Sequence, residues 1–154
     1  MLTKPRQSTQ DDDLSGFECG VDSIDSWVRK HAARAKTAGT AVVYATFDER
    51  TLAGFYTLSA QSIPRANASG RLSRNTPESV PLILLGMLGV DKRYQGIGLG
   101  RDLLLDAVKR SIEISSLIGA KALLVEPIDE HATSFYEKYG FTKLGSGKCL
   151  YAKL

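Results

Sequence analysis

The stretch Gly89-Val90-Asp91-Lys92-Arg93-Tyr94-Gln95-Gly96-Ile97-Gly98-Leu99-Gly100-Arg101 decides the fold of this chain. It follows the apolar run 82–85 and precedes a helical pattern over 100–118. Alternating glycines let backbone N–H groups converge without β-carbons in the way. The following helix adds the N–H groups and the positive dipole end of its first turn. The stretch therefore predicts a strand, a phosphate-binding turn and a helix.

Two common nucleotide-binding loops do not fit this stretch. A dinucleotide loop has the spacing GxGxxG and an acidic residue about 20 residues later in a βαβ unit, whereas the glycines at 96, 98 and 100 are spaced GxGxG. A P-loop ends in Gly-Lys-Ser/Thr, which this stretch lacks. The ligand is therefore expected to be another phosphorylated compound, and the alternative is a glycine-rich turn without a ligand.

The composition is that of a soluble globular protein. The 154 residues fit one domain, 1–154, and 43% of them are hydrophobic. No apolar run approaches the roughly 18 residues of a membrane span, and the N-terminus does not resemble a secretory signal. Cys19 and Cys149 match no metal-ligand spacing and no disulfide framework, which favours a reduced, cytoplasmic setting. The net charge of +3 permits an acidic partner without requiring one.

Hydrophobic periodicity and turn residues predict an alternating α/β order. In chain order the expected elements are a helix from Asp22 or Ser23 to near Gly39, strands at 41–47 and 52–59, a long loop at 62–81, a strand at 82–90, a helix at 100–118, a strand at 122–126, a helix at 130–139 capped by Asp129, and strands at 141–144 and 148–152. The first helix is expected to carry Ile24, Trp27, Val28 and His31 on its apolar face, and the helix at 100–118 to carry Ile112 on or near its own.

Two motifs carry a resemblance to a known family. Gln95-x-x-Gly98-x-Gly100 resembles the coenzyme A pyrophosphate loop of the GNAT N-acetyltransferases, and 132–141 resembles that family's A-x-x-F-Y-x-x-x-G-F segment. The order of the elements is similar as well. The resemblance implies the α/β GNAT fold, in which a central mixed, mostly antiparallel sheet is flanked by helices and acetyl-CoA lies in a cleft between splayed central strands.

Further motifs narrow the resemblance over nearly the whole chain. Phe17-x-Cys19-Gly20, Ile24-Asp25-x-Trp27, Gly54-Phe55-Tyr56-x-Leu58-Ser59 and Leu85-Gly86-x-Leu88-Gly89-Val90-Asp91 resemble the GNAT toxins of type II toxin–antitoxin systems. This implies an enzyme that acetylates the α-amine of aminoacyl-tRNA and blocks translation. It also implies a ribbon-helix-helix antitoxin, operator DNA contacted only through that antitoxin, and a homodimer. Two alternatives stay open: a GNAT enzyme acting on a small amine, peptide or protein N-terminus, and a non-catalytic acyl-CoA-binding module.

The resemblance also assigns roles to residues. By its place in the motif at 132–141, Tyr136 matches the catalytic tyrosine of the family. A phenol with a pKa near 10 can protonate a departing thiolate. A backbone N–H of the strand at 88–90 would polarise the thioester carbonyl. Acetyl-CoA is the expected cosubstrate, with no metal. The residues expected to bind it are Leu88, Gly89, Val90, Gln95, Gly96, Ile97, Gly98, Leu99, Gly100, Arg101 and Phe135.

Scattered cations form a second candidate surface, because Lys and Arg side chains can follow a tRNA backbone. The alternative is that these Lys and Arg side chains form an ordinary solvated surface without a ligand. The candidates are Arg29, Lys30, Arg34, Lys36, Arg65, Arg71, Arg74, Lys92 and Arg93. Met87 departs from the basic residue that related toxins often carry at its position. Asp129 stands where many superfamily members carry Asn, and a capping role is expected for it. His31 and His131 are assigned no chemical role.

Overall fold

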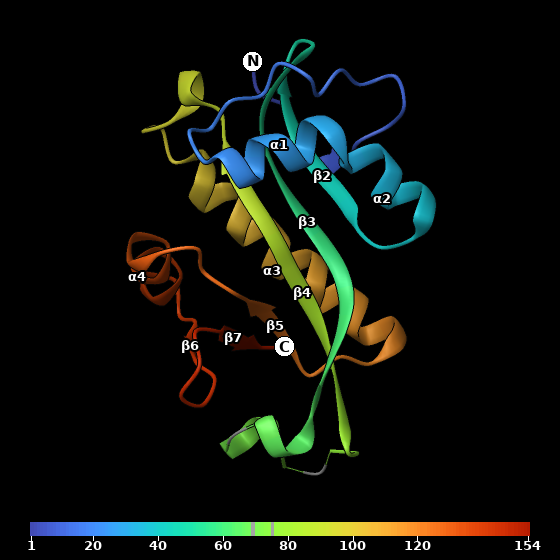
Figure 1. Ribbon diagram of the computed structural model, residues 1–154, viewed down its shortest axis with the longest axis vertical. Coiled ribbons are helices and arrows are strands. Elements are labelled where there is room, and N and C mark those ends of the chain that lie inside the picture. The colour runs from blue at the N-terminus through green and yellow to red at the C-terminus, as the bar shows by residue number, and fades with distance from the viewer. Residues whose placement is uncertain (69, 75) are drawn as a thin grey trace. The chain divides into compact units, whose positions relative to one another are not determined.

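The computed structural model (Figure 1) describes residues 1–68, 70–74 and 76–154. These residues form two compact units. The first unit comprises Met1–Ser59 and Gly86–Ala107, and the second comprises Ala60–Leu85 and Val108–Leu154. The elements, in chain order, are β1 Arg6–Gln7, α1 Asp22–Lys30, α2 Ala32–Ala38, β2 Val42–Asp48, β3 Thr51–Pro64, β4 Ser79–Val90, α3 Leu99–Ile118, β5 Ala122–Val125, α4 Glu130–Lys138, β6 Thr142–Lys143 and β7 Leu150–Lys153, with 3-10 turns η1 Arg65–Asn67, η2 Gly70–Leu72 and η3 Lys92–Tyr94.

The described strands form one mixed sheet in the order β1-β2-β3-β4-β5-β7-β6. β4 and β5 are parallel, whereas β1 with β2, β2 with β3, β5 with β7 and β6 with β7 are antiparallel. The expected α/β class, with a mostly antiparallel sheet and flanking helices, is therefore confirmed. Among the described residues, no helix combines the length and the apolar character needed to cross a membrane.

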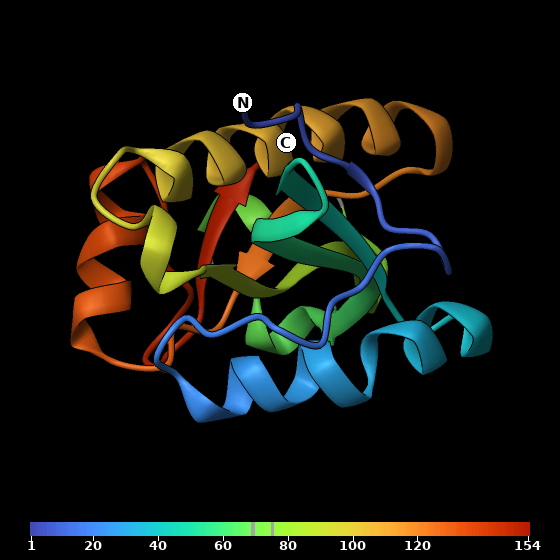
Figure 2. The ribbon, with the colours of Figure 1, turned by 90° about the horizontal axis from the view of Figure 1, so that it is seen from above.

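In the first unit, helices cover both faces of the sheet (Figure 2). Two glycines on neighbouring strands show which helix lies on which face. A β-carbon on Gly54 of β3 would meet Leu103 of α3 at 2.8 Å, whereas one on Gly89 of β4 would meet Ile24 of α1 at 3.1 Å and the Phe17 ring at 3.2 Å. The core of this unit lies on the face of the sheet that α1 covers. It comprises Phe17, Ile24, Val28, Ala32, Val43, Ala45, Phe47, Leu52 and Phe55.

The second unit is built around β5, whose four residues Ala122–Val125 are all buried. An uninterrupted apolar run is typical of a strand covered on both faces. β5 pairs in parallel with β4, Leu84 opposite Leu124, and in antiparallel with β7, Leu124 opposite Tyr151. The core of this unit comprises Leu72, Val80, Leu82, Ala122, Leu124 and Leu144.

Five expectations about the elements were wrong in detail. The first helix is two helices, α1 and α2, broken at His31, and its N-cap is Val21 without a side-chain cap rather than Asp22 or Ser23. His31 is exposed. Residues 24, 28 and 32 still lie in the same buried cluster, so the apolar stripe of α1 continues into α2 across the break.

The expected loop at 62–81 is shorter than predicted. β3 extends to Pro64 and β4 begins at Ser79, so residues 65–78 remain, with two 3-10 turns. The two strands thus take in residues 60–64 and 79–81, several of which have weak strand propensity. On α3, Ile112 is 52% exposed and lies off the buried face, whereas Ser111 is fully buried.

Candidate active site

The glycine loop of the first unit has the backbone conformation that its sequence predicts. Gly96 and Gly98 have φ angles of 81° and 85°, values that favour glycine. A β-carbon on Gly96 would meet nothing within 4 Å, so this side of the loop is open. Ile97 between them is 61% exposed. The loop thus presents bare backbone to its surroundings, as an anion-binding turn must.

The loop leads directly into the first turn of α3. The N–H of Asp102 donates to the Gly98 carbonyl at 3.1 Å. The N–H groups of residues 99–101 therefore precede the first backbone donor of the helix, and the positive end of its dipole lies with them. Leu99 is buried and Arg101 is exposed. Leu99 can therefore serve an anion only through its backbone, while the Arg101 guanidinium lies beside Gly98, 3.0 Å from an ideal β-carbon there.

The side chain of Gln95 is engaged with protein carbonyls. Its Nε2 donates to the Cys19 carbonyl at 2.9 Å and to the Val90 carbonyl at 2.8 Å. The carboxamide thus joins the start of the loop to the end of β4. This contact brings together the two segments expected to bind the cosubstrate, 88–90 and 95–101. The Gln95 side chain, however, donates its hydrogen bonds to backbone carbonyls of the protein and not toward a ligand.

The end of β4 has an irregular hydrogen-bonding partner. The Met87 N–H donates to a side-chain acceptor, the hydroxyl of Thr57 on the neighbouring strand β3, at 3.0 Å. Gly86 makes room for this contact, because a β-carbon there would lie 2.8 Å from Thr57 Oγ1. Met87 packs against the core cluster of the first unit, so its side chain contributes to packing. The residues that follow, Leu88–Val90, are the ones expected to meet the pantetheine arm.

A buried carboxylate stands between β4 and the loop. Asp91 is 2% exposed and accepts from the backbone N–H of Arg93 at 3.0 Å and from its Nε at 2.9 Å. It also accepts from the Glu18 N–H at 3.1 Å. Burial raises the pKa of Asp91, but the hydrogen bonds from Arg93 and Glu18 outweigh it and hold that pKa below its usual range.

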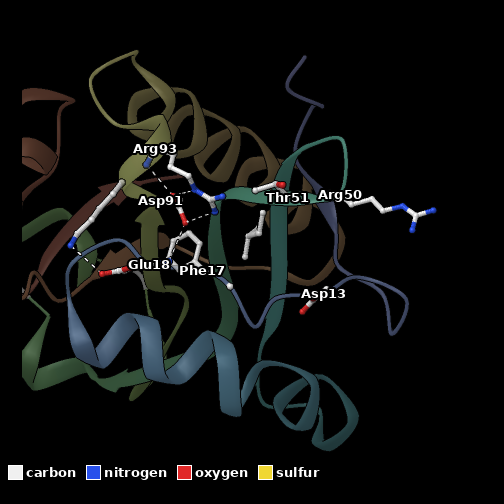
Figure 3. Close-up of a pocket in the computed structure, with 10 residues that line it drawn as sticks. Asp13, Phe17, Glu18, Arg50, Thr51, Asp91 and Arg93 are labelled. Carbon is white, nitrogen blue, oxygen red and sulfur yellow. Dashed lines mark hydrogen bonds and ion pairs between the residues drawn. The ribbon is translucent and has the colours of Figure 1, made fainter.

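A pocket of about 360 Å³ lies beside this carboxylate (Figure 3). Figure 3 shows Arg93 folded back onto Asp91, with Glu18 nearby. The ammonium of Lys92 pairs with Glu18 at 3.2 Å. Because these cations and carboxylates pair with one another, the pocket carries little excess charge. Its lining comes from several separate segments of the first unit.

Tyr136 lies in the second unit, on α4. It is 7% exposed, and its ring contacts those of Phe135 and Phe141 at centroid distances of 5.3 and 5.6 Å. Burial raises the pKa of the phenol, which therefore remains a proton donor across the physiological range. Asp129 caps α4 by accepting from the Ala132 N–H at 2.7 Å, which confirms its expected role. Phe135 is half-buried among these rings.

The nine candidate cations differ in their surroundings. Arg29 donates from Nε to the Phe17 carbonyl at 2.7 Å, and Lys36 donates to the Ser8 carbonyl at 3.2 Å. Lys92 and Arg93 pair with carboxylates. Lys30, Arg34, Arg65 and Arg74 are exposed. The side chain of Arg71 lies outside the part of the chain that the structure describes.

Three residues of this region carried no predicted role. Asp25 and Asp91 appeared in the sequence analysis only as members of motifs, and Thr57 only as a residue of the expected strand at 52–59. Asp25 is 5% exposed and accepts from the N–H groups of Cys19 and Gly20 at 2.8 and 3.3 Å. A polar residue inside an apolar pattern was the available signal for Asp25, but its partner could not be read from the sequence.

Comparison with known proteins decides the family. The profile described as "Acetyltransferase (GNAT) domain" matches residues 26–143. The chain belongs to the GNAT acetyltransferases. It is 38% identical over 137 residues to a tRNA-acetylating toxin of Mycobacterium tuberculosis, covering 89% of this chain and 82% of the relative. It is 34% identical over 145 residues to a probable toxin TacT of Sinorhizobium fredii, covering 87% and 80%.

Solved structures resemble this GNAT acetyltransferase over 99% of its length. AtaT complexed with acetyl-methionyl-tRNA superposes with a TM-score of 0.89 at 28% identity, covering 95% of that chain. A mutant of AtaT bound to the C-terminus of the antitoxin AtaR and to acetyl-CoA gives 0.83 at 26%, covering 93%. A KacTA–DNA complex gives 0.84 at 26%, covering 93%. Acetyl-CoA, the expected cosubstrate, is thus bound by a relative of the same fold.

Proposed function

We propose that this GNAT acetyltransferase is a toxin that transfers the acetyl group of acetyl-CoA to the α-amine of an aminoacyl-tRNA. The observation that carries the proposal is the 38% identity to a tRNA-acetylating toxin over 89% of the chain. An N-acetylated aminoacyl-tRNA lacks the free amine that peptide-bond formation needs, so elongation stops. We further propose that both compact units, residues 1–154, act as one GNAT domain.

In this proposal the backbone of the first unit holds the cosubstrate. The N–H groups of Gly96–Arg101 bind the pyrophosphate, with the α3 dipole adding to the attraction. The backbone of Leu88–Val90 pairs with the pantetheine arm, and one of its N–H groups polarises the thioester carbonyl. Acetyl-CoA supplies the acetyl group as a thioester. Gln95 contributes to cosubstrate binding by fixing the start of the glycine loop to the end of β4.

Tyr136 supplies the proton that the departing thiolate needs. The neutral amine nitrogen forms a bond to the carbonyl carbon and releases a proton to water, the C–S bond breaks, and the sulfur takes the phenol proton. Water then returns a proton to the Tyr136 oxygen, so the enzyme is restored. A tyrosine whose pKa is raised by burial stays protonated at neutral pH, so the donor is present in each molecule. Phe135, which directly precedes Tyr136 in the chain, packs against its ring. In this proposal Phe135 lies beside the acetyl group of the bound cosubstrate.

The tRNA and the partners complete the proposal. Exposed cations of α1 and α2, among them Lys30 and Arg34, attract the phosphate backbone. A ribbon-helix-helix antitoxin neutralises the enzyme, operator DNA is reached only through that antitoxin, and the toxin is a homodimer. AtaT with the AtaR C-terminus and the KacTA–DNA complex support the antitoxin and DNA parts.

The test is a transfer assay with isolated components. Purified protein is incubated with labelled acetyl-CoA and a pool of aminoacyl-tRNAs, the RNA is digested with nuclease, and N-acetyl-aminoacyl-adenosines are identified by mass spectrometry. We expect one or a few acetylated species and their loss with Tyr136→Phe. Uncharged tRNA and free amino acids serve as controls. If no aminoacyl-tRNA is acetylated while a small amine or a peptide N-terminus is, the proposed substrate is wrong.

A further inference from the structure

The segment Phe17–Gly20, here called the strap, runs along the base of the glycine loop. The Glu18 N–H donates to the buried Asp91 carboxylate at 3.1 Å. In return, the Lys92 N–H donates to the Glu18 carbonyl at 2.8 Å. These two bonds leave the backbone of Glu18 paired on both sides with the residues that begin the loop.

The Gln95 side chain adds a third connection between the strap and the loop. Its Nε2 donates both to the Cys19 carbonyl of the strap and to the Val90 carbonyl at the end of β4. An amide nitrogen has two hydrogens, and the two carbonyls account for both. The loop that follows contains Gly96 and Gly98, which have no side chains with which to fix themselves, so its position depends on the base to which Gln95 ties it.

The strap is itself anchored to α1. The Asp25 carboxylate accepts from the N–H groups of Cys19 and Gly20 at 2.8 and 3.3 Å. Arg29 Nε donates to the Phe17 carbonyl at 2.7 Å. The Phe17 ring is 1% exposed and belongs to the core. An unbroken series of hydrogen bonds therefore leads from α1, through the strap, to the loop.

We infer that the strap positions the cofactor loop and that Asp25, Arg29 and Gln95 are positioning residues for acetyl-CoA binding. The inference rests on the proposed function only in assigning the loop to the pyrophosphate. It changes the role of Arg29, which stands among the candidate tRNA contacts. Its Nε faces the strap, so its loss loosens the coenzyme A site, whereas loss of the neighbouring Lys30 affects only attraction of the tRNA.

Isothermal titration of the full chain with coenzyme A tests this inference without an acetyl acceptor. We expect Arg29→Met and Gln95→Leu each to raise the Kd for coenzyme A about tenfold, the equivalent of about 1.4 kcal/mol. Lys30→Met, the matched control on the same helix, leaves that Kd unchanged. The KM for aminoacyl-tRNA is measured in parallel and rises with Lys30→Met but not with Arg29→Met.

Gln95→Arg separates positioning from direct phosphate contact. Arginine retains N–H donors for the two carbonyls and adds a charge. If Gln95 positions the loop, this variant binds coenzyme A within about twofold of the parent, and the dependence of log Kd on log salt keeps the parent's slope. If the side chain contacts the phosphates, the slope steepens.

Three results would overturn the inference: an unchanged Kd in both Arg29→Met and Gln95→Leu, a change confined to the KM for tRNA, or a steeper salt slope in Gln95→Arg. Thermal melts followed by circular dichroism establish that the variants fold. Gln95 is exposed, so Gln95→Leu tests the strap even if Arg29→Met is unstable. Wild-type protein that binds coenzyme A but acetylates no aminoacyl-tRNA would contradict the proposed function and leave this inference standing.

Discussion

Replacing Thr57 by Val removes one hydrogen bond at the irregular point of β4 and keeps the side chain's shape. Thr57 is 3% exposed, and its hydroxyl accepts the Met87 N–H at 3.0 Å. Valine fills the same space but offers no acceptor. Leaving a backbone N–H unpaired in the interior costs about 1–3 kcal/mol, and we expect the free energy of unfolding to fall by that amount.

The same change is expected to lower acetyl transfer. Met87 directly precedes Leu88–Val90, whose backbone is proposed to align the thioester, so an unpaired N–H allows this segment to shift. A loss of about 1.4 kcal/mol in transition-state stabilisation lowers kcat about tenfold. Gly86→Ala, which would bring a β-carbon to 2.8 Å from the Thr57 hydroxyl, is expected to disturb the same contact.

The assay combines urea unfolding with single-turnover transfer from acetyl-CoA. Thr57→Ser is the matched control, because it keeps the hydroxyl and loses only a methyl group, at a cost of about 1 kcal/mol in stability. We expect Thr57→Ser to keep the parent's kcat and Thr57→Val to lose it. The reasoning fails if Thr57→Val matches the parent in both measurements, or if both variants lose the same kcat, since packing of the methyl group would then be responsible.

Three further predictions concern single side chains. Tyr136→Phe is expected to lower kcat by about 10²–10⁴-fold at an unchanged Kd for coenzyme A, measured by transfer kinetics and calorimetry. Asp129→Ala removes the bond to the Ala132 N–H and should destabilise the protein by about 1 kcal/mol in urea unfolding, whereas Asp129→Asn should be nearly neutral. The pKa of Asp91 is lowered in the folded state, so its charged form stabilises the protein above about pH 4, and this contribution is lost on acidification. The stability difference between Asp91→Asn and the parent should therefore be largest near neutral pH and shrink toward pH 3, and a difference that grows on acidification would contradict this assignment.

Local features of the fold were predictable because their causes lie within a few residues. The glycine loop, the helix from Leu99 to Ile118 and the Asp129 cap follow from backbone freedom, periodicity and capping chemistry. These effects act over one or two turns of chain. The sequence therefore predicted the glycine turn and the helix that follows it, whereas the mostly antiparallel pairing of the sheet was expected from the resemblance to the GNAT family.

Long-range contacts were not predictable in the same way. Glu18 and Asp91 are 73 positions apart, and Gln95 and Cys19 are 76 apart. Which backbone group each polar side chain meets depends on tertiary packing, which no local pattern encodes.

The environments of the cations separate two electrostatic roles that composition treats as one. Lys36 donates to a neutral carbonyl, which does not offset its charge, whereas the nearby Asp25 carboxylate offsets part of the charge of Arg29. Lys92 and Arg93 pair with carboxylates, which cancels much of their field at the distance of a tRNA phosphate. In the first unit, attraction of the tRNA backbone is therefore expected to come mainly from α1 and α2. α1 anchors the strap and is also the helix on which tRNA contact is proposed. We therefore expect the binding of the acceptor and the position of the coenzyme A loop to depend on the same few hydrogen bonds.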